Sequence, residues 1–388
     1  MILTQCAVCA TDLGLTLGKK CGRCSTRYCG PECQVQHWKE GGHDKLCKPI
    51  KKAGGAEQYY ANKNYAEALA VAVKKCAEDT KGQTCYICTQ AIHWKTKEGL
   101  VRGCACRGTA GYAHVSCLAE QAKILVAEAL ENNLALLERF NRWHVCSLCE
   151  QKYHGVVRCA LGWACWKTYL GRPETDRLRR TAMSLLAGGL SEVGHHGDAL
   201  SMQETELSML RRTNAPEGHL LAAHANLATT YASLGRYERA LQIERDLYSG
   251  RLKLHGEEDP RTLTAGLNYA ASFVNLGRFG ETKSLLCKVI PVARRVLGES
   301  HDNVLRMKWN YALALYKDAG ATLDDLREAV TTLEDAQRIA RRVFGGAHPL
   351  AVDIETCLRE ARETLAAREG DDVSSVCDGV AAMTPRGA

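Results

Sequence analysis

Apolar positions recur in a fixed pattern along the second half of the chain. A motif of the form Asn-x-Ala, followed by Leu-Gly-Arg and an aromatic residue, begins at Asn226 and returns at Asn268. It returns again, with an altered turn, at Asn310, so both steps are 42 residues long. Gly256 and Gly298 share that spacing. Each step predicts two amphipathic helices joined by a turn in which glycine takes the left-handed conformation.

These helix pairs predict an α-solenoid over residues 177–368. One pair cannot bury its apolar stripe alone, so neighbouring pairs stack and share a core. The first pair, which contains Leu185 and Leu186, matches the repeat pattern poorly. In a later pair, Pro291 lies inside the second predicted helix and should kink that helix. We expect a capping helix from Pro349 to Arg368 and a disordered tail over 369–388. The alternative is a helical bundle whose self-similarity is coincidental.

Helical periodicity in the first half is confined to three segments. A helix over 56–77 carries Tyr65, Leu69 and Val73 on one face, a second lies between Cys117 and Cys146, and a third is rich in tryptophan near residue 163. The expected fold class is therefore mainly α, with two small cross-braced zinc fingers ahead of the solenoid. The expected domains are a finger (1–50), a helical linker (51–81), a second finger (82–155) and a linker helix (156–176).

Cysteine usage separates the two halves of the chain. Seventeen of the 20 cysteines lie before residue 166. We find no signal peptide and no run of about 18 apolar residues that could span a membrane. These features predict an intracellular protein, cytoplasmic or nuclear, whose paired cysteines bind metal rather than form disulfides.

Metal binding also changes the charge of the protein. The formal net charge is +7 with every cysteine counted as neutral. Fourteen thiolates and four Zn²⁺ ions would reduce it to about +1. Net charge therefore gives no support to nucleic-acid binding, although Lys19, Lys20, Arg23 and Arg27 form a local basic cluster.

The first finger contains eight ligand-type residues in four close pairs. One pair supplies only two of the four ligands of a tetrahedral zinc site, so pairs must combine across the loops. The segment contains little apolar material, so metal binding would supply much of its folding free energy. The pairs are Cys6/Cys9, Cys21/Cys24, Cys29/Cys33 and His43/Cys47.

With Tyr28 before Cys29 and His37-Trp38 before His43, this segment resembles the MYND zinc finger. The resemblance implies interleaved sites, Cys6/Cys9/Cys29/Cys33 on one zinc and Cys21/Cys24/His43/Cys47 on the other, with His37 as a non-ligand. It also implies binding of short peptides. Trp38 and Tyr28 would either line the peptide groove or only pack the small core.

The second finger again has eight ligands in four pairs, in the order C4HC3. They are Cys85/Cys88, Cys104/Cys106, His114/Cys117 and Cys146/Cys149. The seven residues between Cys106 and His114, with Gly108, Gly111 and Tyr112 among them, resemble the RING-CH finger. The resemblance implies Cys85/Cys88/His114/Cys117 on one zinc and Cys104/Cys106/Cys146/Cys149 on the other. A PHD finger, which shares this ligand order and reads histone tails, is the alternative.

RING-CH domains act as ubiquitin ligases, and the resemblance implies that Ile87 contacts a ubiquitin-conjugating enzyme. Two positions depart from the family, since Gln121 replaces a tryptophan and Glu150 replaces a cationic residue. The 28 residues between Cys117 and Cys146 are also long for the family. These departures favour a scaffold in which the finger only binds proteins.

The 42-residue pattern resembles tetratricopeptide repeats of the kinesin-light-chain variety. Such repeats hold peptides or partner helices in a concave groove, where Asn226, Asn268 and Asn310 would bond a partner backbone or only pack locally. The expected function is a four-zinc interaction protein that recruits substrates through its MYND finger and repeats for ubiquitin transfer. The alternatives are a non-catalytic scaffold and a MYND-containing lysine methyltransferase, which the lack of space for a SET domain disfavours.

Overall fold

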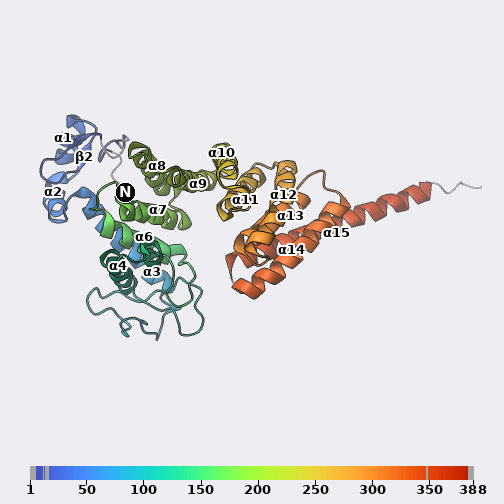
Figure 1. Ribbon diagram of the computed structural model, residues 1–388, viewed down its shortest axis with the longest axis horizontal. Helices are drawn as coiled ribbons and strands as arrows, with labels where there is room; N and C mark the ends of the chain where they lie inside the picture. The colour runs from blue at the N-terminus through green and yellow to red at the C-terminus, as the bar shows by residue number, and fades with distance from the viewer. Residues whose placement is uncertain (1–5, 12, 14–16, 347, 383–388) are drawn as a thin grey trace, which may run out of the picture. The chain divides into compact units, whose positions relative to one another are not determined.

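The computed structural model describes residues 6–11, 13, 17–346 and 348–382, with side chains up to Gly370. The protein is mainly helical, with small cysteine-rich modules ahead of stacked helix pairs, which confirms the expected fold class (Figure 1). The chain forms two compact units, Met1–Leu234 and Gly235–Ala388. The boundary falls between two helices of the stretch that the sequence assigns to one repeat array.

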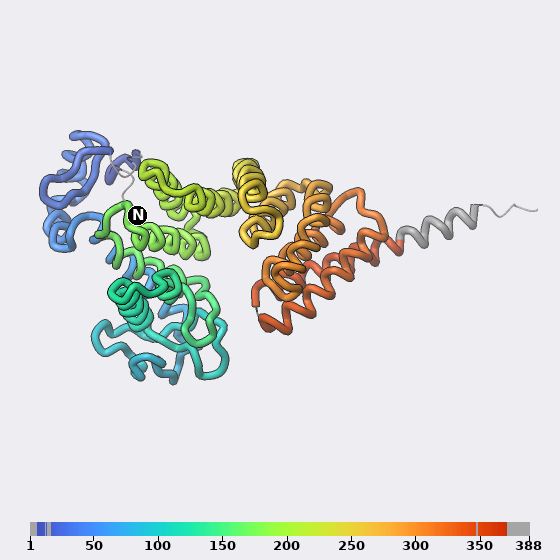
Figure 2. The backbone as a smooth tube through the Cα atoms, in the orientation of Figure 1, coloured from blue at the N-terminus to red at the C-terminus, as the bar shows by residue number. Residues whose placement is uncertain are grey.

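The first unit begins with the MYND-like segment. A two-stranded antiparallel sheet pairs Lys19 with Tyr28 and Lys20 with Arg27. Two short helices follow it, and a long helix leads into the second module, as the backbone trace in Figure 2 shows. These elements are β1 (Lys19–Lys20), β2 (Arg27–Tyr28), α1 (Pro31–Lys39), α2 (His43–Lys52) and α3 (Ala56–Cys76).

The second module contains little regular structure before its helices. Isolated bridges join Val101 to Ala113 and Val145 to Lys152. The insertion between Cys117 and Cys146 is helical, as the apolar pattern predicts, but it is broken into three pieces. These are α4 (Val115–Glu131), α5 (Leu136–Phe140) and the 3-10 helix η1 (Asn141–Trp143).

Helix α6 (Gly155–Tyr169) forms the centre of the first unit. One side shares a core with the second module through Val157, Ala160 and Leu161. The other side carries Trp163 and Trp166, which belong to a second core together with residues of α7 (Arg177–Glu192) and α8 (His196–Arg212). Cys159 and Cys165 on α6 are buried free thiols, as the sequence predicts.

Glycines allow α6 and α7 to approach closely. A Cβ at Gly162 would lie 3.0 Å from the Cα of Leu186, and a Cβ at Gly189 would lie 2.9 Å from the Cα of Cys159. Real Cβ atoms essentially never come as close to backbone as 2.9 Å, and a 3.0 Å contact is tighter than nine in ten real ones, so the absence of side chains at both positions lets the two helices cross here.

The remaining helices follow the predicted repeat. Gly235 and Gly277 have φ of 72° and 68° at the turns inside the pairs, which confirms the left-handed turn. Pro291 lies inside α12 without ending it. The helices are α9 (Glu217–Ser233), α10 (Tyr237–His255), α11 (Pro260–Asn275), α12 (Phe279–Leu297), α13 (Asp302–Tyr316), α14 (Leu323–Phe344) and α15 (Pro349–Ala382).

Helix α15 packs on α13 and α14 through Leu350, Ile354 and Leu358, so it covers the end of the array. It continues past Arg368 to Ala382. The tail predicted over 369–388 has no described side chains after Gly370, and its last six residues lie outside the described residues. Disorder of the tail stays a prediction.

Candidate metal centres

All four Cys-x2-Cys segments form the same turn. The backbone N–H of the first cysteine donates to a carbonyl five residues later, as in Cys85 to Gln90 at 3.0 Å and Cys146 to Gln151 at 2.9 Å. The residue after the second cysteine has positive φ in every case, at Ala10, Ser25, Thr89 and Glu150. Positive φ is uncommon for residues other than glycine, so four identical occurrences indicate one shared constraint.

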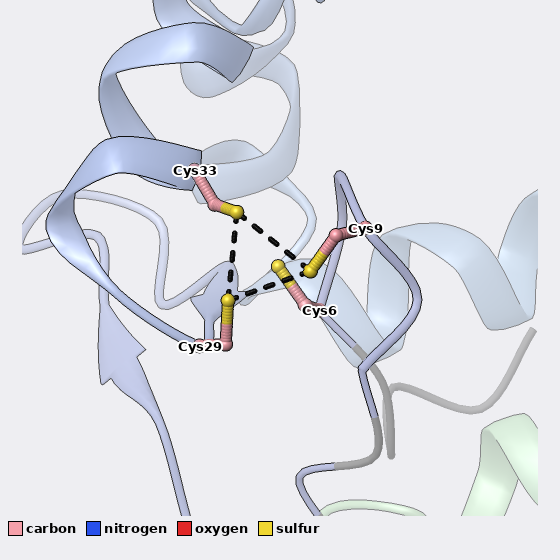
Figure 3. Close-up of side chains that lie close together, drawn as sticks. All are labelled: Cys6, Cys9, Cys29 and Cys33. Carbon is pink, nitrogen blue, oxygen red and sulfur yellow. Dashed lines mark hydrogen bonds between the residues drawn. The ribbon is translucent and has the colours of Figure 1, made fainter.

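The first cluster of the MYND-like segment consists of Cys6, Cys9, Cys29 and Cys33, whose sulfur atoms face a common centre (Figure 3). Sγ of Cys9 lies 3.4 Å from Sγ of Cys29 and 3.7 Å from Sγ of Cys33. Cys33 comes from α1, whereas the other three lie on loops. Cys9 and Cys29 are exposed.

The second cluster is fully buried and consists of Cys21, Cys24, His43 and Cys47. Helix α2 supplies His43 from its first turn and Cys47 from its second. Nε2 of His43 lies 3.4 Å from Sγ of Cys24, and Sγ of Cys21 lies 3.9 Å from Sγ of Cys47.

In the second module, Cys85, Cys88, His114 and Cys117 form the third cluster. Nδ1 of His114 lies 3.3 Å from Sγ of Cys88, while its Nε2 lies 3.3 Å from the carbonyl oxygen of Ala91. A proton on Nε2 donated to this carbonyl leaves Nδ1 free as the metal-binding atom.

Helix α4 carries Cys117, and the buried Glu98 fixes its first turn. The Glu98 carboxylate accepts hydrogen bonds from the Ser116 backbone N–H at 2.7 Å and from its hydroxyl at 2.8 Å. A carboxylate at this position satisfies otherwise unpaired N–H groups and opposes the positive end of the helix dipole. Glu98 therefore positions a ligand without being one.

The fourth cluster consists of Cys104, Cys106, Cys146 and Cys149. Sγ of Cys106 lies 3.8 Å from Sγ of Cys146. A hydrogen bond from Cys104 lowers the pKa of the Cys146 thiol to about 4, whereas the same contact raises the pKa of Cys104. Cys146 is therefore already a thiolate at neutral pH, the form that binds metal.

The spacing of the donor atoms fits tetrahedral zinc. Four sulfur atoms about 2.3 Å from one Zn²⁺ lie about 3.8 Å apart, and replacing one with a closer histidine nitrogen shortens that edge slightly. The sulfur–sulfur distances given above run from 3.4 to 3.9 Å. In every cluster all donor atoms lie within 4.8 Å of one another.

Burial also favours the form of histidine that binds metal. It lowers the pKa of both His43 and His114, so each imidazole is neutral at physiological pH. Threonine hydroxyls lie 3.1 Å from two of the sulfurs, Thr11 beside Cys9 and Thr26 beside Cys24. The hydrogen bond from Thr11 lowers the pKa of the Cys9 thiol to about 6, which favours the thiolate.

The four groups that the structure brings together have the same members as the sequence-predicted ligand sets. His37 belongs to none of them, because its Nδ1 pairs with the hydroxyl of Tyr28 at 3.0 Å. Tyr28 is fully buried, so the interpretation that it lines a peptide groove is wrong and it packs the core instead. Trp38 remains 46% exposed.

The repeat asparagines differ from one another. Asn226 is exposed, Asn268 is half-buried and hydrogen-bonds Glu244, and Asn310 is buried. A buried amide is not available to a partner backbone. At Asn310 the local packing role is therefore the one that the structure supports.

Sequence reasoning identified Ile87 but missed a second apolar side chain in a comparable turn. Ile87, between Cys85 and Cys88, is 37% exposed, and Leu148, between Cys146 and Cys149, is 50% exposed. The hydroxyl groups of Tyr86 and Ser147 lie 3.1 Å apart and connect these turns. The Cys-x2-Cys signal could have located Leu148, since its position in the fourth pair matches that of Ile87 in the first.

Comparison with known proteins identifies two modules. The MYND finger matches residues 6–47, and a tetratricopeptide repeat matches residues 220–261, in α9, α10 and the start of α11. Both are protein-interaction modules, so this chain has a protein-interaction role. The MYND finger and the four clusters together indicate zinc binding.

Several solved structures are similar to parts of the chain. BtubC (BKLC) from P. vanneervenii is 15% identical, with a TM-score of 0.40 over 71% of this chain and 93% of that one. A kinesin-light-chain-type protein of Podosopora anserina, with nearly identical TPR-like repeats, is 18% identical, with a TM-score of 0.38 over 59% of this chain and 97% of that one. Comparison with curated proteins gave no match. Among the described residues, no helix combines the length and apolar character needed to cross a bilayer.

Proposed function

We propose that the chain binds four zinc ions, and that its second module is a RING-CH-type finger that docks a ubiquitin-conjugating enzyme. The MYND finger and the repeats would hold the substrate. The observation that carries this proposal is the pair of exposed apolar side chains, Ile87 and Leu148, on two cysteine turns linked by the Tyr86–Ser147 hydrogen bond. An intracellular location, cytoplasmic or nuclear, follows from the need to keep the thiols reduced.

The zinc ions would have a structural role. Each cluster offers four protein ligands, which fill a tetrahedral shell and leave no position for a reactive water. The chemistry would belong to the conjugating enzyme and its thioester. Docking on Ile87 and Leu148 would hold that thioester near the substrate, which raises the rate by positioning.

An autoubiquitination assay with a panel of conjugating enzymes tests the proposal. Wild type should form ubiquitin chains with at least one enzyme, while Ile87→Ala and Leu148→Ala should each reduce the rate about tenfold or more. Cys85→Ser should abolish activity and remove zinc. Leu254→Ala, at a side chain 51% exposed on α10, is the matched control and should keep full activity.

Zinc content distinguishes a docking defect from misfolding. Ile87→Ala and Leu148→Ala should retain as much zinc as wild type, because neither side chain supplies a ligand. If both variants ubiquitinate normally, these turns are not the docking surface.

A non-catalytic scaffold is the second candidate, and Glu150 favours it. Glu150 follows the last ligand, and its side chain is 77% exposed and lies 3.8 Å from Arg142. A carboxylate there cannot make the contact to ubiquitin that a cationic residue makes in RING-CH fingers. Inactivity of wild type with every enzyme would establish the scaffold, and Glu150→Arg would then show whether this residue is the cause.

A further inference from the structure

An apolar recess lies between α3, α6 and the turn from α7 to α8, apart from the four metal clusters. Its volume is about 450 Å³, which falls within the range of ligand-binding pockets. All its lining residues belong to the first compact unit. The apolar part of the lining is formed by Ala68, Val71, Val156, Trp163, Leu190 and Val193.

The lining combines rigid and accessible parts. Trp163 and Leu190 belong to the buried core of the unit and form a fixed wall. Val71, by contrast, is 54% exposed although it lies next to this apolar surface. Covering the exposed valine and the apolar recess with another apolar group would remove both surfaces from water and lower the free energy of the system.

Cys159 also lines the recess, but its thiol is not suited to act as a nucleophile or a metal ligand. Burial raises the pKa of its thiol to about 11, so the thiol is neutral at physiological pH. It belongs to none of the four donor clusters found among the described residues. Cys159 therefore acts as one more apolar wall residue.

The polar part of the lining has two acidic residues, Glu67 and Asp198, beside the uncharged amide of Asn64 and the imidazole of His195. Glu67 contacts Lys63 at 3.8 Å, but both side chains are largely exposed, so the pair is weak and exchangeable. Asp198 has no ion-pair partner within the described part of the chain. The nearby cation Arg158 is already paired with Glu192 and does not line the recess.

We propose that this recess binds a segment of a partner protein in which a bulky apolar side chain is flanked by lysine or arginine. The apolar side chain would fill the space against Trp163 and Leu190. The flanking cations would meet Glu67 and Asp198, an arrangement that selects partners by charge as well as by shape. This site is separate from Ile87 and Leu148, so it can fail or succeed independently of the proposed ligase function.

A phage-displayed library of random 12-residue peptides, selected on the full zinc-loaded chain, provides the probe. The Ala68→Trp variant, which fills the recess, serves for counter-selection. Peptides that bind wild type and not this variant should contain an aromatic residue or leucine next to lysine or arginine. Their affinity is then measured by fluorescence anisotropy with synthetic peptide.

Matched variants separate occupancy of the recess from loss of the fold. Ala68→Trp should weaken binding about tenfold or more, whereas Ala70→Trp, at an exposed position of the same helix, should leave it unchanged. The double variant Glu67→Gln, Asp198→Asn removes both negative charges at nearly constant volume and should also weaken binding about tenfold. Zinc content and helicity should equal those of wild type.

Three results would overturn the proposal. The first is a selection that yields no peptide sensitive to Ala68→Trp. The second is selected peptides that carry acidic rather than basic flanks. The third is a concentration-dependent dimer, detected by sedimentation and abolished by Ala68→Trp, because a second copy of the chain would then be the occupant.

Discussion

At the scale of single residues, the two clusters of the MYND finger differ in the exposure of their ligands. Cys9 and Cys29 are exposed, whereas Cys21, Cys24, His43 and Cys47 are all buried. A chelator removes zinc by replacing ligands one at a time, so it must first reach the metal. Two sites within one small module should therefore differ in kinetic stability.

We predict that a chelator removes zinc from the Cys6/Cys9/Cys29/Cys33 cluster before it removes zinc from the buried cluster. Zinc release followed with a colorimetric chelator should show a fast phase of one equivalent out of the four that we propose. Cys29→Ser should remove this phase, and Cys47→Ser should not. Cys287→Ser, at an exposed cysteine outside the clusters, is the control. Loss of the same phase in both ligand variants would contradict the assignment.

Glu244 on α10 is a charged residue inside the repeat array. It is 2% exposed, its Oε2 has no hydrogen-bond partner among the described residues, and Asn268 bonds its side chain. Burial raises its pKa from 4.5 to about 8. Between these values the folded chain holds one proton more than the unfolded chain. The free energy of unfolding therefore falls as pH rises through this window and levels off above it.

We predict that Glu244→Gln removes this pH dependence. Glutamine keeps the shape and hydrogen-bonding capacity of the protonated acid, so the variant should match wild type near pH 5. Above pH 5 the free energy of unfolding of the variant should exceed that of wild type, and the difference should grow by about 1 kcal/mol per pH unit up to pH 8. Urea unfolding followed by circular dichroism, with zinc saturating, measures this difference. Glu238→Gln, on the exposed side of α10, should show no such trend.

At the scale of elements, the contact between α6 and α7 depends on adjacent glycines with different surroundings. A Cβ at Gly189 would meet the backbone of Arg158 and Cys159 at 2.9 to 3.2 Å. A Cβ at Gly188 would meet only the end of the Arg158 side chain, at 2.8 Å. The arginine side chain can move aside, whereas a packed helix backbone cannot.

We predict opposite effects from the same substitution at these two positions. Gly189→Ala should destabilise the first unit by about 1–3 kcal/mol, because the helices must separate. Gly188→Ala should be neutral or stabilise by up to about 1 kcal/mol, because alanine favours the helix. Thermal unfolding of both variants gives the comparison. Equal destabilisation would mean that α6 and α7 do not cross as closely as the structure shows.

Elements differ in how far the sequence could predict them. The ligand pairs and the Gly235 and Gly277 turns follow from local spacing, so their positions were predictable. Positive φ at Ala10, Ser25 and Thr89 was not, because it comes from closing the cysteine turn and not from the side chain. The recess and the two-sided packing of α6 were also unpredictable, since they depend on contacts between distant segments.

At the scale of the whole molecule, α6 joins the core that holds the two clusters of the second module to the core of the first repeat helices. The core of the second module contains Cys85, Cys117 and Cys146 together with Val157 and Leu161 of α6. The next core joins the opposite side of α6 to α7 and α8. The cores around α11 to α15 contain no residue of a metal cluster. Unfolding caused by loss of zinc should therefore spread from the second module through α6 and should not reach the later repeats.

We predict that zinc removal raises amide hydrogen exchange in α6 and α7 about tenfold or more while α13 and α14 keep their protection. Without zinc, the cysteines in the core of the second module are no longer held in place, so Val157 and Leu161 lose their packing partners. Helix α6 then no longer supports α7. Hydrogen exchange is measured by mass spectrometry in the presence of chelator. Chelator already saturated with zinc is the control. If α7 keeps full protection, the helices pack without the metal-held module. If α13 loses protection as well, the two units unfold as one.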